Sequence, residues 1–215
     1  MSTPKSIIVI GAGGHAKVVI ETLLEMGITP IGVTDADPSR TGEKLLGIQI
    51  LGDDRILEKY PPSQVDLVIG IGSTQASPFR QTLFESFKVR GYHFVGICHP
   101  SAVIGRETVI GEGAQIMAGV VIQPGCSIGQ GVIVNTGARI DHDSFIGTFS
   151  HIAPGATLAG NVHVGDNCHI GCGASVLQNI LIGDNATVGL GAAVIRDVAP
   201  DSRVIGVPAR ETAHA

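Results

Sequence analysis

The segment Asp141-His142-Asp143 places one histidine directly between two carboxylates. A neutral imidazole can accept a proton near neutral pH, because the unperturbed pKa of histidine is about 6.5. Asp143, or Asp141 on the other side, could hold the tautomer of the ring and stabilise the imidazolium that forms. The segment is therefore a candidate general base with an orienting acid; the alternative interpretation is a polar turn that faces solvent.

Residues 11–16 read Gly-Ala-Gly-Gly-His-Ala, and Asp35 follows about two dozen positions later. This spacing is typical of a turn that leads from a strand into a helix and binds phosphate through its backbone N–H groups. The whole α/β segment is too short for the usual six-stranded dinucleotide fold. We therefore favour a nucleotide-sugar over a dinucleotide, and a turn that only packs the helix onto the sheet stays the alternative.

The other histidines and the cysteines show no metal-binding spacing. His142, His151, His163 and His169 are separated by nine, twelve and six positions, so they lack the His-x4-His pair of zinc-dependent β-helix carbonic anhydrases. We expect His163 and His169 to lie at the surface or an interface. The four cysteines contain no CxxC pair, and we expect reduced thiols in the core or in turns and no metal.

An aliphatic residue recurs every six positions through the second half of the chain, and small or turn-forming residues surround it. A hexapeptide period predicts a coil with three flat faces, in which short parallel strands direct aliphatic side chains inward. The sixteen positions give about five coils: Ile104, Ile110, Ile116, Ile122, Ile128, Val134, Ile140, Ile146, Ile152, Leu158, Val164, Ile170, Val176, Ile182, Val188 and Val194.

The first hundred residues alternate between strand and helix patterns. We expect strands over residues 6–10, 31–33, 65–71 and 93–98, and helices after the glycine turn and over residues 79–90. This alternation predicts a parallel sheet with right-handed crossovers. We therefore predict two domains, a Rossmann-like nucleotide-sugar-binding domain over residues 1–98 and a β-helix over residues 99–215.

Together these motifs resemble the sugar O- and N-acyltransferases with a left-handed parallel β-helix. The features that match are the Gly-Gly-His turn, Ile-Gly near residue 71, the His-Pro-Ser junction at residue 99, Ile-Asp-His-Asp, and Gly-Val-Pro-Ala-Arg at residues 206–210. The chain looks most like the N-acetyltransferases that act on nucleotide-linked 4-amino-4,6-dideoxy sugars of the bacillosamine and perosamine type. Sialic acid O-acetyltransferases are near relatives, so sugar O-acetylation stays the alternative.

The resemblance implies an enzyme of bacterial surface glycan biosynthesis, a homotrimer that uses acetyl-CoA as co-substrate. It implies that His142 is the general base and Asp143 its acidic neighbour, and that three residues meet acetyl-CoA: His151, Cys172 and Leu190. It also implies that the nucleotide or sugar meets Gly13, Gly14, His15, Asp35, Ala36 and Gly72. The family usually has Asn or Asp after this last glycine, where the present chain has Ser73.

Composition argues against several other functions. The chain has 215 residues, a net charge of -5 and no basic stripe, so we expect no nucleic-acid partner. It has no apolar stretch of membrane-spanning length and no secretory signal pattern, and we expect a cytoplasmic protein. A non-catalytic scaffold or nucleotide sensor is the remaining alternative, and the presence of His142 argues against it.

Overall fold

The computed structural model describes residues 5–212, which form two compact units. The first unit contains the chain up to Gly72 together with Phe79–Ile97. The second contains Ser73–Pro78 and the chain from Cys98 onwards. The short segment Ser73–Pro78, which the sequence analysis assigned to the first domain, therefore packs as part of the β-helix unit.

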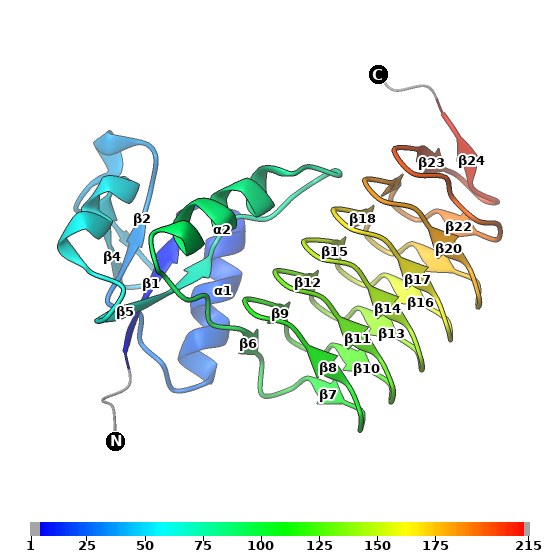
Figure 1. The fold of residues 1–215 in the computed structure, drawn as a ribbon, viewed down its shortest axis with the longest axis horizontal. Helices are drawn as coiled ribbons and strands as arrows, with labels where there is room; N and C mark the ends of the chain where they lie inside the picture. Colours follow the sequence, from blue (N-terminus) through cyan, green and yellow to red (C-terminus); the bar gives the residue numbers. More distant parts are fainter. Residues whose placement is uncertain (1–4, 213–215) are drawn as a thin grey trace. The chain divides into compact units, whose positions relative to one another are not determined.

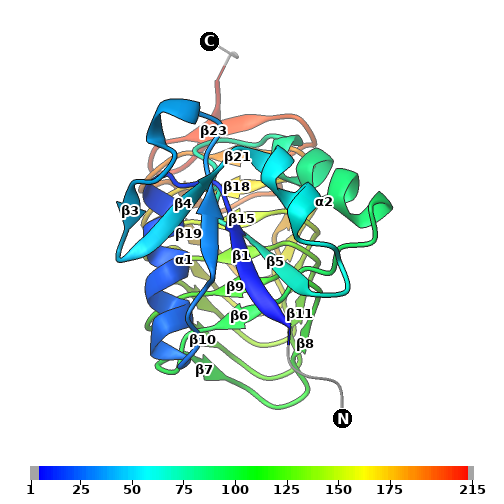
Figure 2. The ribbon, with the colours of Figure 1, turned by 90° about the vertical axis from the view of Figure 1, so that its left-hand side faces the viewer.

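The first unit is built on a five-stranded sheet with the order β3-β4-β2-β1-β5. Figure 2 labels four of these strands, β3, β4, β1 and β5. Four strands run parallel: β1 (Ser6–Ile10), β2 (Gly32–Thr34), β4 (Ile48–Gly52) and β5 (Val65–Ile69). The fifth, β3 (Lys44–Leu45), is antiparallel to β4. The predicted parallel sheet is thus confirmed, with an additional hairpin at its edge.

The β3–β4 hairpin was not predicted, because Leu46 is an unusual residue for the first position of its turn. Leu46 and Gly47, the two turn residues, both have positive φ, at 48° and 84°. Two consecutive positive φ angles define the tight hairpin turn that matches the twist of the strands, and this turn usually carries Asn or Asp at its first position. A leucine there gives no hairpin signal.

Two helices and two 3-10 helices complete the first unit: α1 (Gly14–Glu25), α2 (Phe79–Val89), η1 (Pro38–Arg40) and η2 (Asp54–Lys59). Helix α1 buries one face, which includes Ala16, Val19, Ile20 and Leu23. The strand expected over residues 93–98 is wrong in its extent. Only Phe94 forms a bridge, to Leu67 of β5, and β6 (Ile97–Cys98) already belongs to a sheet of the β-helix.

The second unit is a stack of coils with two-residue strands on three sheets, as Figure 1 shows from β7 to β24. Up to β22, neighbouring strands on one sheet lie 18 residues apart and pair in parallel, for example Ile122 with Ile140. Strand β23 lies 16 residues after β21, and β24 is antiparallel to β23. The strands are β7 (Val103–Ile104), β8 (Val109–Ile110), β9 (Gln115–Ile116), β10 (Val121–Ile122), β11 (Ser127–Ile128), β12 (Ile133–Val134), β13 (Arg139–Ile140), β14 (Phe145–Ile146), β15 (His151–Ile152), β16 (Thr157–Leu158), β17 (His163–Val164), β18 (His169–Ile170), β19 (Ser175–Val176), β20 (Leu181–Ile182), β21 (Thr187–Val188), β22 (Ala193–Val194), β23 (Arg203–Ile205) and β24 (Arg210–Glu211).

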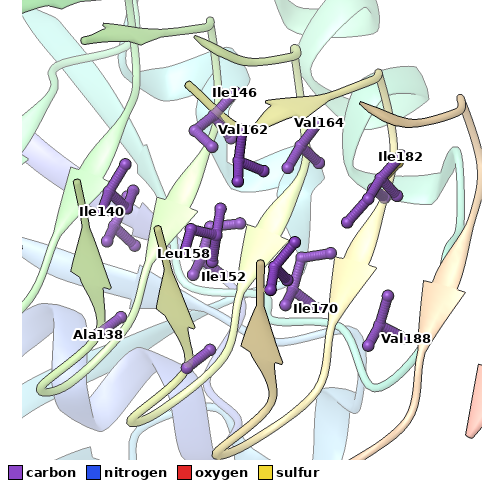
Figure 3. Packing of buried hydrophobic residues seen from close by; sticks show 14 of the residues in the cluster. Ala138, Ile140, Ile146, Ile152, Leu158, Val162, Val164, Ile170, Ile182 and Val188 are labelled. Atoms are coloured by element: carbon purple, nitrogen blue, oxygen red, sulfur yellow. The ribbon is translucent and has the colours of Figure 1, made fainter. Parts of the chain in front are cut away.

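Each of the sixteen hexapeptide aliphatics is the second residue of its strand, so the predicted β-helix register is confirmed. Fourteen of them belong to one buried aliphatic core, as Figure 3 shows for Ile140, Ile152 and Ile170. In the first coil, Ile104 is only partly buried against this core and Ile110 is exposed. Small or medium-sized residues, such as Ala138 and Ala156, fill the space two positions before them. This interior has little room for aromatic side chains, in line with an aromatic content of 4%.

The turns of the β-helix also repeat every six residues. From Glu107 to Gly191, every sixth residue has a φ between 54° and 77°. This left-handed conformation favours Gly, Asn and Asp, and most of these positions carry one of the three. Asp143 occupies one of them, with a φ of 59°. The turn geometry therefore accounts for the residue type that follows His142.

Candidate active site

His142 and Asp143 form a hydrogen-bonded pair in the turn that follows β13. Nδ1 of His142 lies 2.8 Å from Oδ2 of Asp143, and the backbone N–H of His142 donates to Oδ1 of Asp141 at 2.8 Å. A carboxylate only accepts hydrogen bonds, so Nδ1 carries the proton and Nε2 presents its lone pair. The bond to Asp143 raises the pKa of His142 above its ordinary value. The pair is solvent-exposed, so a ligand can reach Nε2 of His142.

Two glycines in the neighbouring coils make room for this pair. A methyl group at Gly160 would come within 2.5 Å of Nε2 of His142, and one at Gly125 would come within 2.7 Å of Oδ1 of Asp143. The imidazole therefore lies over a position that only glycine leaves open. Neither glycine was predicted as a site residue, although each lies 18 positions, one full coil, from His142 or Asp143, and this spacing is a usable signal.

His151 lies on a different face, on β15, and is buried. Its Nδ1 lies 3.1 Å from the Ser73 carbonyl oxygen and its Nε2 lies 3.0 Å from Nδ2 of Asn135. A carbonyl accepts and an amide nitrogen donates, so Nδ1 is protonated and Nε2 is the acceptor. The amide of Asn135 is oriented by Thr136, whose N–H donates to Oδ1 at 2.8 Å. His151 is thus held in one tautomer and ties Ser73 to the β-helix.

His163 and His169 differ from each other in exposure. His163 is exposed and stacks on Phe145, with 4.5 Å between the ring centroids. His169 is buried beside the His151 ring, which corrects the expectation of a surface or interface histidine. Its Nδ1 has no hydrogen-bond partner within residues 5–212, and burial lowers its pKa to about 4. The first residue of a β-helix strand points away from the aliphatic interior, but His169, the first residue of β18, is nevertheless buried.

Cys172 and Leu190 lie in equivalent turns of successive coils, after β18 and β21. The backbone N–H of Gly191 donates to the carbonyl of Cys172 at 2.8 Å, which fixes the two turns next to each other. Both side chains are exposed, Leu190 to 83%. The other cysteines are also free thiols: Cys98 is exposed, whereas Cys126 and Cys168 belong to the aliphatic core. The structure therefore brings two of the three predicted acetyl-CoA contacts, Cys172 and Leu190, together in neighbouring turns.

Two successive side-chain hydrogen bonds hold the glycine turn of the first unit. The backbone N–H of Gly11 donates to Oγ1 of Thr34 at 3.2 Å, and Thr34 donates to Oδ1 of Asp54 at 2.6 Å. Gly13 and Gly14 are exposed, and a methyl group at either would meet nothing within 4 Å among the described residues. The first turn of α1 is therefore open to an anion.

The other predicted residues of the first unit lie in α1 or follow the ends of β2 and β5. A methyl group at Gly72 would lie 3.3 Å from Cβ of His15, so these two residues are neighbours. Asp35 follows β2 and is hydrogen-bonded, whereas Ala36 is exposed. Thr34, Asp54 and the ion-paired Arg40 were missed, because their contacts join segments that carry no common sequence pattern.

Within residues 5–212, no three His, Cys, Asp or Glu side chains are grouped so that they could hold a metal ion. None of the helices in the described part of the chain combines the length and the apolar character that a membrane crossing needs.

Comparison with known proteins gives matches over most of the chain. The family described as PglD N-terminal domain matches residues 6–87, and the bacterial transferase hexapeptide family, described as six repeats, matches residues 107–142 and 143–178. Among curated relatives, UDP-N-acetylbacillosamine N-acetyltransferase of Bacillus subtilis is 34% identical over 123 residues, or 53% of this chain. The chain spans 52% of that relative and 22% of a second one, an uncharacterized protein of Acanthamoeba polyphaga mimivirus.

Two solved structures are similar over nearly their whole length. PerB of Caulobacter crescentus, in complex with CoA and GDP-perosamine, is 38% identical with a TM-score of 0.90, and the match covers 98% of this chain and 99% of that one. The acetyltransferase domain of PglB from Neisseria gonorrhoeae, in complex with acetyl coenzyme A, is 34% identical with a TM-score of 0.89, and the match covers 98% and 100%.

Proposed function

Because the chain belongs to the PglD-like family of hexapeptide-repeat sugar N-acetyltransferases, we propose that it moves an acetyl group from acetyl-CoA to a nucleotide-linked amino sugar. The acceptor we propose is the 4-amino group of a 4-amino-4,6-dideoxy sugar, as in GDP-perosamine, the ligand of the Caulobacter relative. Such a product would serve the biosynthesis of bacterial surface glycans.

The hydrogen-bonded pair His142–Asp143 carries the mechanistic part of the proposal. A sugar amine is mostly protonated near neutral pH, and only its free lone pair attacks a thioester. Nε2 of His142 takes the proton from the amine nitrogen, and Asp143 stabilises the imidazolium through Nδ1–H. The freed amine nitrogen bonds to the thioester carbon and loses a second proton to the CoA sulfur as the carbon–sulfur bond breaks. His142 then releases its proton to solvent and is again a neutral base. The products are the amide and CoA.

The remaining site residues divide between the two substrates. We assign the nucleotide-sugar to Gly13, Gly14, His15, Gly72, Asp35 and Ala36, where the open first turn of α1 suits a diphosphate. We assign acetyl-CoA to the exposed edge formed by Cys172 and Leu190, and to His151, which acts from a fixed orientation because both ring nitrogens are engaged. We further propose a homotrimer, which light scattering at micromolar concentration tests.

The deciding experiment is an end-point assay with acetyl-CoA and the UDP-, GDP- and dTDP-linked 4-amino sugars. We expect one of these nucleotide-sugars to yield an N-acetylated product by mass spectrometry, and His142→Ala to lose at least 100-fold in kcat, an order of magnitude typical of general-base loss. Full turnover by His142→Ala would exclude the base assignment. O-acetylation of free sialic acid, with no nucleotide-sugar accepted, would replace the N-acetyltransferase by an O-acetyltransferase.

A further inference from the structure

Arg40 connects two parts of the first unit that the sequence separates. It is the last residue of η1, and Asp37 caps this short helix by accepting from the Ser39 N–H at 2.9 Å. Nη1 of Arg40 donates to the carbonyl oxygen of Ala12 in the glycine turn at 3.2 Å, and the same nitrogen contacts the Asp35 carboxylate. One guanidinium therefore bridges the glycine turn and the end of β2.

This bridge fixes the orientation of the Asp35 carboxylate. Oδ1 accepts from the backbone N–H of Asp37 at 2.9 Å, and Oδ2 is bound by Arg40. Arg40 itself is held from a third side, because its Nε donates to Glu43 at 3.2 Å. Asp35 is thus aimed by its neighbours before any ligand arrives, and one side of Arg40 stays accessible, with 32% of its side chain exposed.

Arg40 also compensates negative charge near the glycine turn. Residues 35–44 contain three carboxylates, on Asp35, Asp37 and Glu43, and two cations, Arg40 and Lys44. The cation that pairs with Asp35 is Arg40. A nucleoside diphosphate brings further negative charge to the first turn of α1. Without Arg40, Asp35 would face that diphosphate as an uncompensated like charge, which opposes binding.

We propose that Arg40 is a positioning residue of the nucleotide site, which aims and neutralises Asp35 so that the diphosphate group of a nucleotide-sugar can bind at the glycine turn. This inference rests on the proposed function and adds to it a residue outside the glycine-turn motif. Arg40 acts through Ala12 and Asp35, so its loss weakens nucleotide binding and leaves the chemistry at His142 intact.

The test measures binding of UDP, GDP and dTDP to the full-length protein by calorimetry, in wild type and Arg40→Ala. We expect the affinity for the preferred diphosphate to fall roughly 10-fold or more, as for other lost hydrogen bonds to charged groups. KM for the nucleotide-sugar should rise by the same factor, while kcat at saturation and KM for acetyl-CoA stay within about twofold. Arg40→Lys, which keeps the charge but not the planar fork, should be intermediate.

Arg55→Ala is the matched control, because Arg55 also pairs with a nearby aspartate, Asp53, but is 85% exposed. It should leave nucleotide affinity unchanged. Nucleotide binding by Arg40→Ala within twofold of wild type would overturn the inference, as would an affinity loss that merely follows a lower melting temperature. Full recovery by Arg40→Lys would overturn the positioning role. If the wild type acetylates a sugar but binds no nucleoside diphosphate, the proposed nucleotide-linked substrate fails instead.

Discussion

The imidazole of His142 lies over Gly160 of the next coil, where a methyl group would come within 2.5 Å of Nε2. Gly160→Ala should therefore push the ring away from its bond with Asp143 while leaving the coil intact, because the strands on both sides remain unchanged. We expect kcat to fall roughly 10- to 100-fold, because displacing a catalytic base by about 1 Å lowers the rate by factors of this size. Steady-state kinetics with both substrates saturating measure it.

Gln178→Ala is the control for that substitution, because Gln178 is exposed and occupies the same turn position one coil further along. It should leave kcat unchanged. Unfolding in urea should show a small stability change for both variants. An active Gly160→Ala protein with wild-type kcat would mean that the ring orientation seen here does not matter for turnover.

The pH dependence of turnover should report the bond between His142 and Asp143. The base works when neutral, so kcat falls as the pH falls through the pKa of His142, which the bond to Asp143 raises above 6.5. Asp143→Asn removes the negative charge that favours the imidazolium. Its acidic limb should therefore move to lower pH, and its plateau should fall, but less than that of His142→Ala.

Asparagine is a suitable replacement because the turn tolerates it. Asn161 and Asn179 hold the same left-handed conformation in the next two coils, with φ of 55° and 61°. A change in the profile therefore reflects chemistry and not a refolded turn. An acidic limb that stays at the same pH in Asp143→Asn would show that another group sets it.

The β-helix could be predicted almost completely from sequence, because its signal is local and repeated. Each of the sixteen aliphatics obeys the same packing rule, so an error at one position would not shift the register of the others. The glycine turn and His142 were identifiable for a similar reason, since each is a short segment whose residue types carry their own chemistry. The β3–β4 hairpin was not, because Leu46 occupies a turn position that usually carries Asn or Asp.

Contacts between distant segments left no such signal. Ser73 and His151 are 78 positions apart, and no periodicity relates them. Arg40 and Ala12 meet only because the sheet brings the end of β2 beside the glycine turn. These contacts fix the orientation of the side chains that they join. The candidate site residues could therefore be named from the sequence, but the hydrogen bonds that hold them could not.

The tautomer of His151 is a direct consequence of its two partners. Nitrogen-15 NMR of labelled histidine should show the proton on Nδ1 and none on Nε2. Asn135→Ala removes the donor to Nε2 and should cost about 1–2 kcal/mol in the free energy of unfolding. Ser73→Ala keeps the carbonyl acceptor and should cost less. A protonated Nε2 in the wild type would contradict the assigned bonds.

The buried His169 should make the free energy of unfolding fall in mild acid. Burial lowers its pKa to about 4, whereas the unfolded chain regains the ordinary value of 6.5, so the unfolded state binds the proton first as the pH falls. Stability is unaffected above pH 6.5 and is lost between 6.5 and 4, by about 3 kcal/mol at the lower limit. Urea unfolding from pH 7.5 to 4.5 measures the slope. His169→Gln should flatten this dependence of the unfolding free energy on pH. His163→Gln is the control and should leave the slope unchanged, because His163 is exposed. Equal slopes in wild type and His169→Gln would show that another group causes the acid sensitivity.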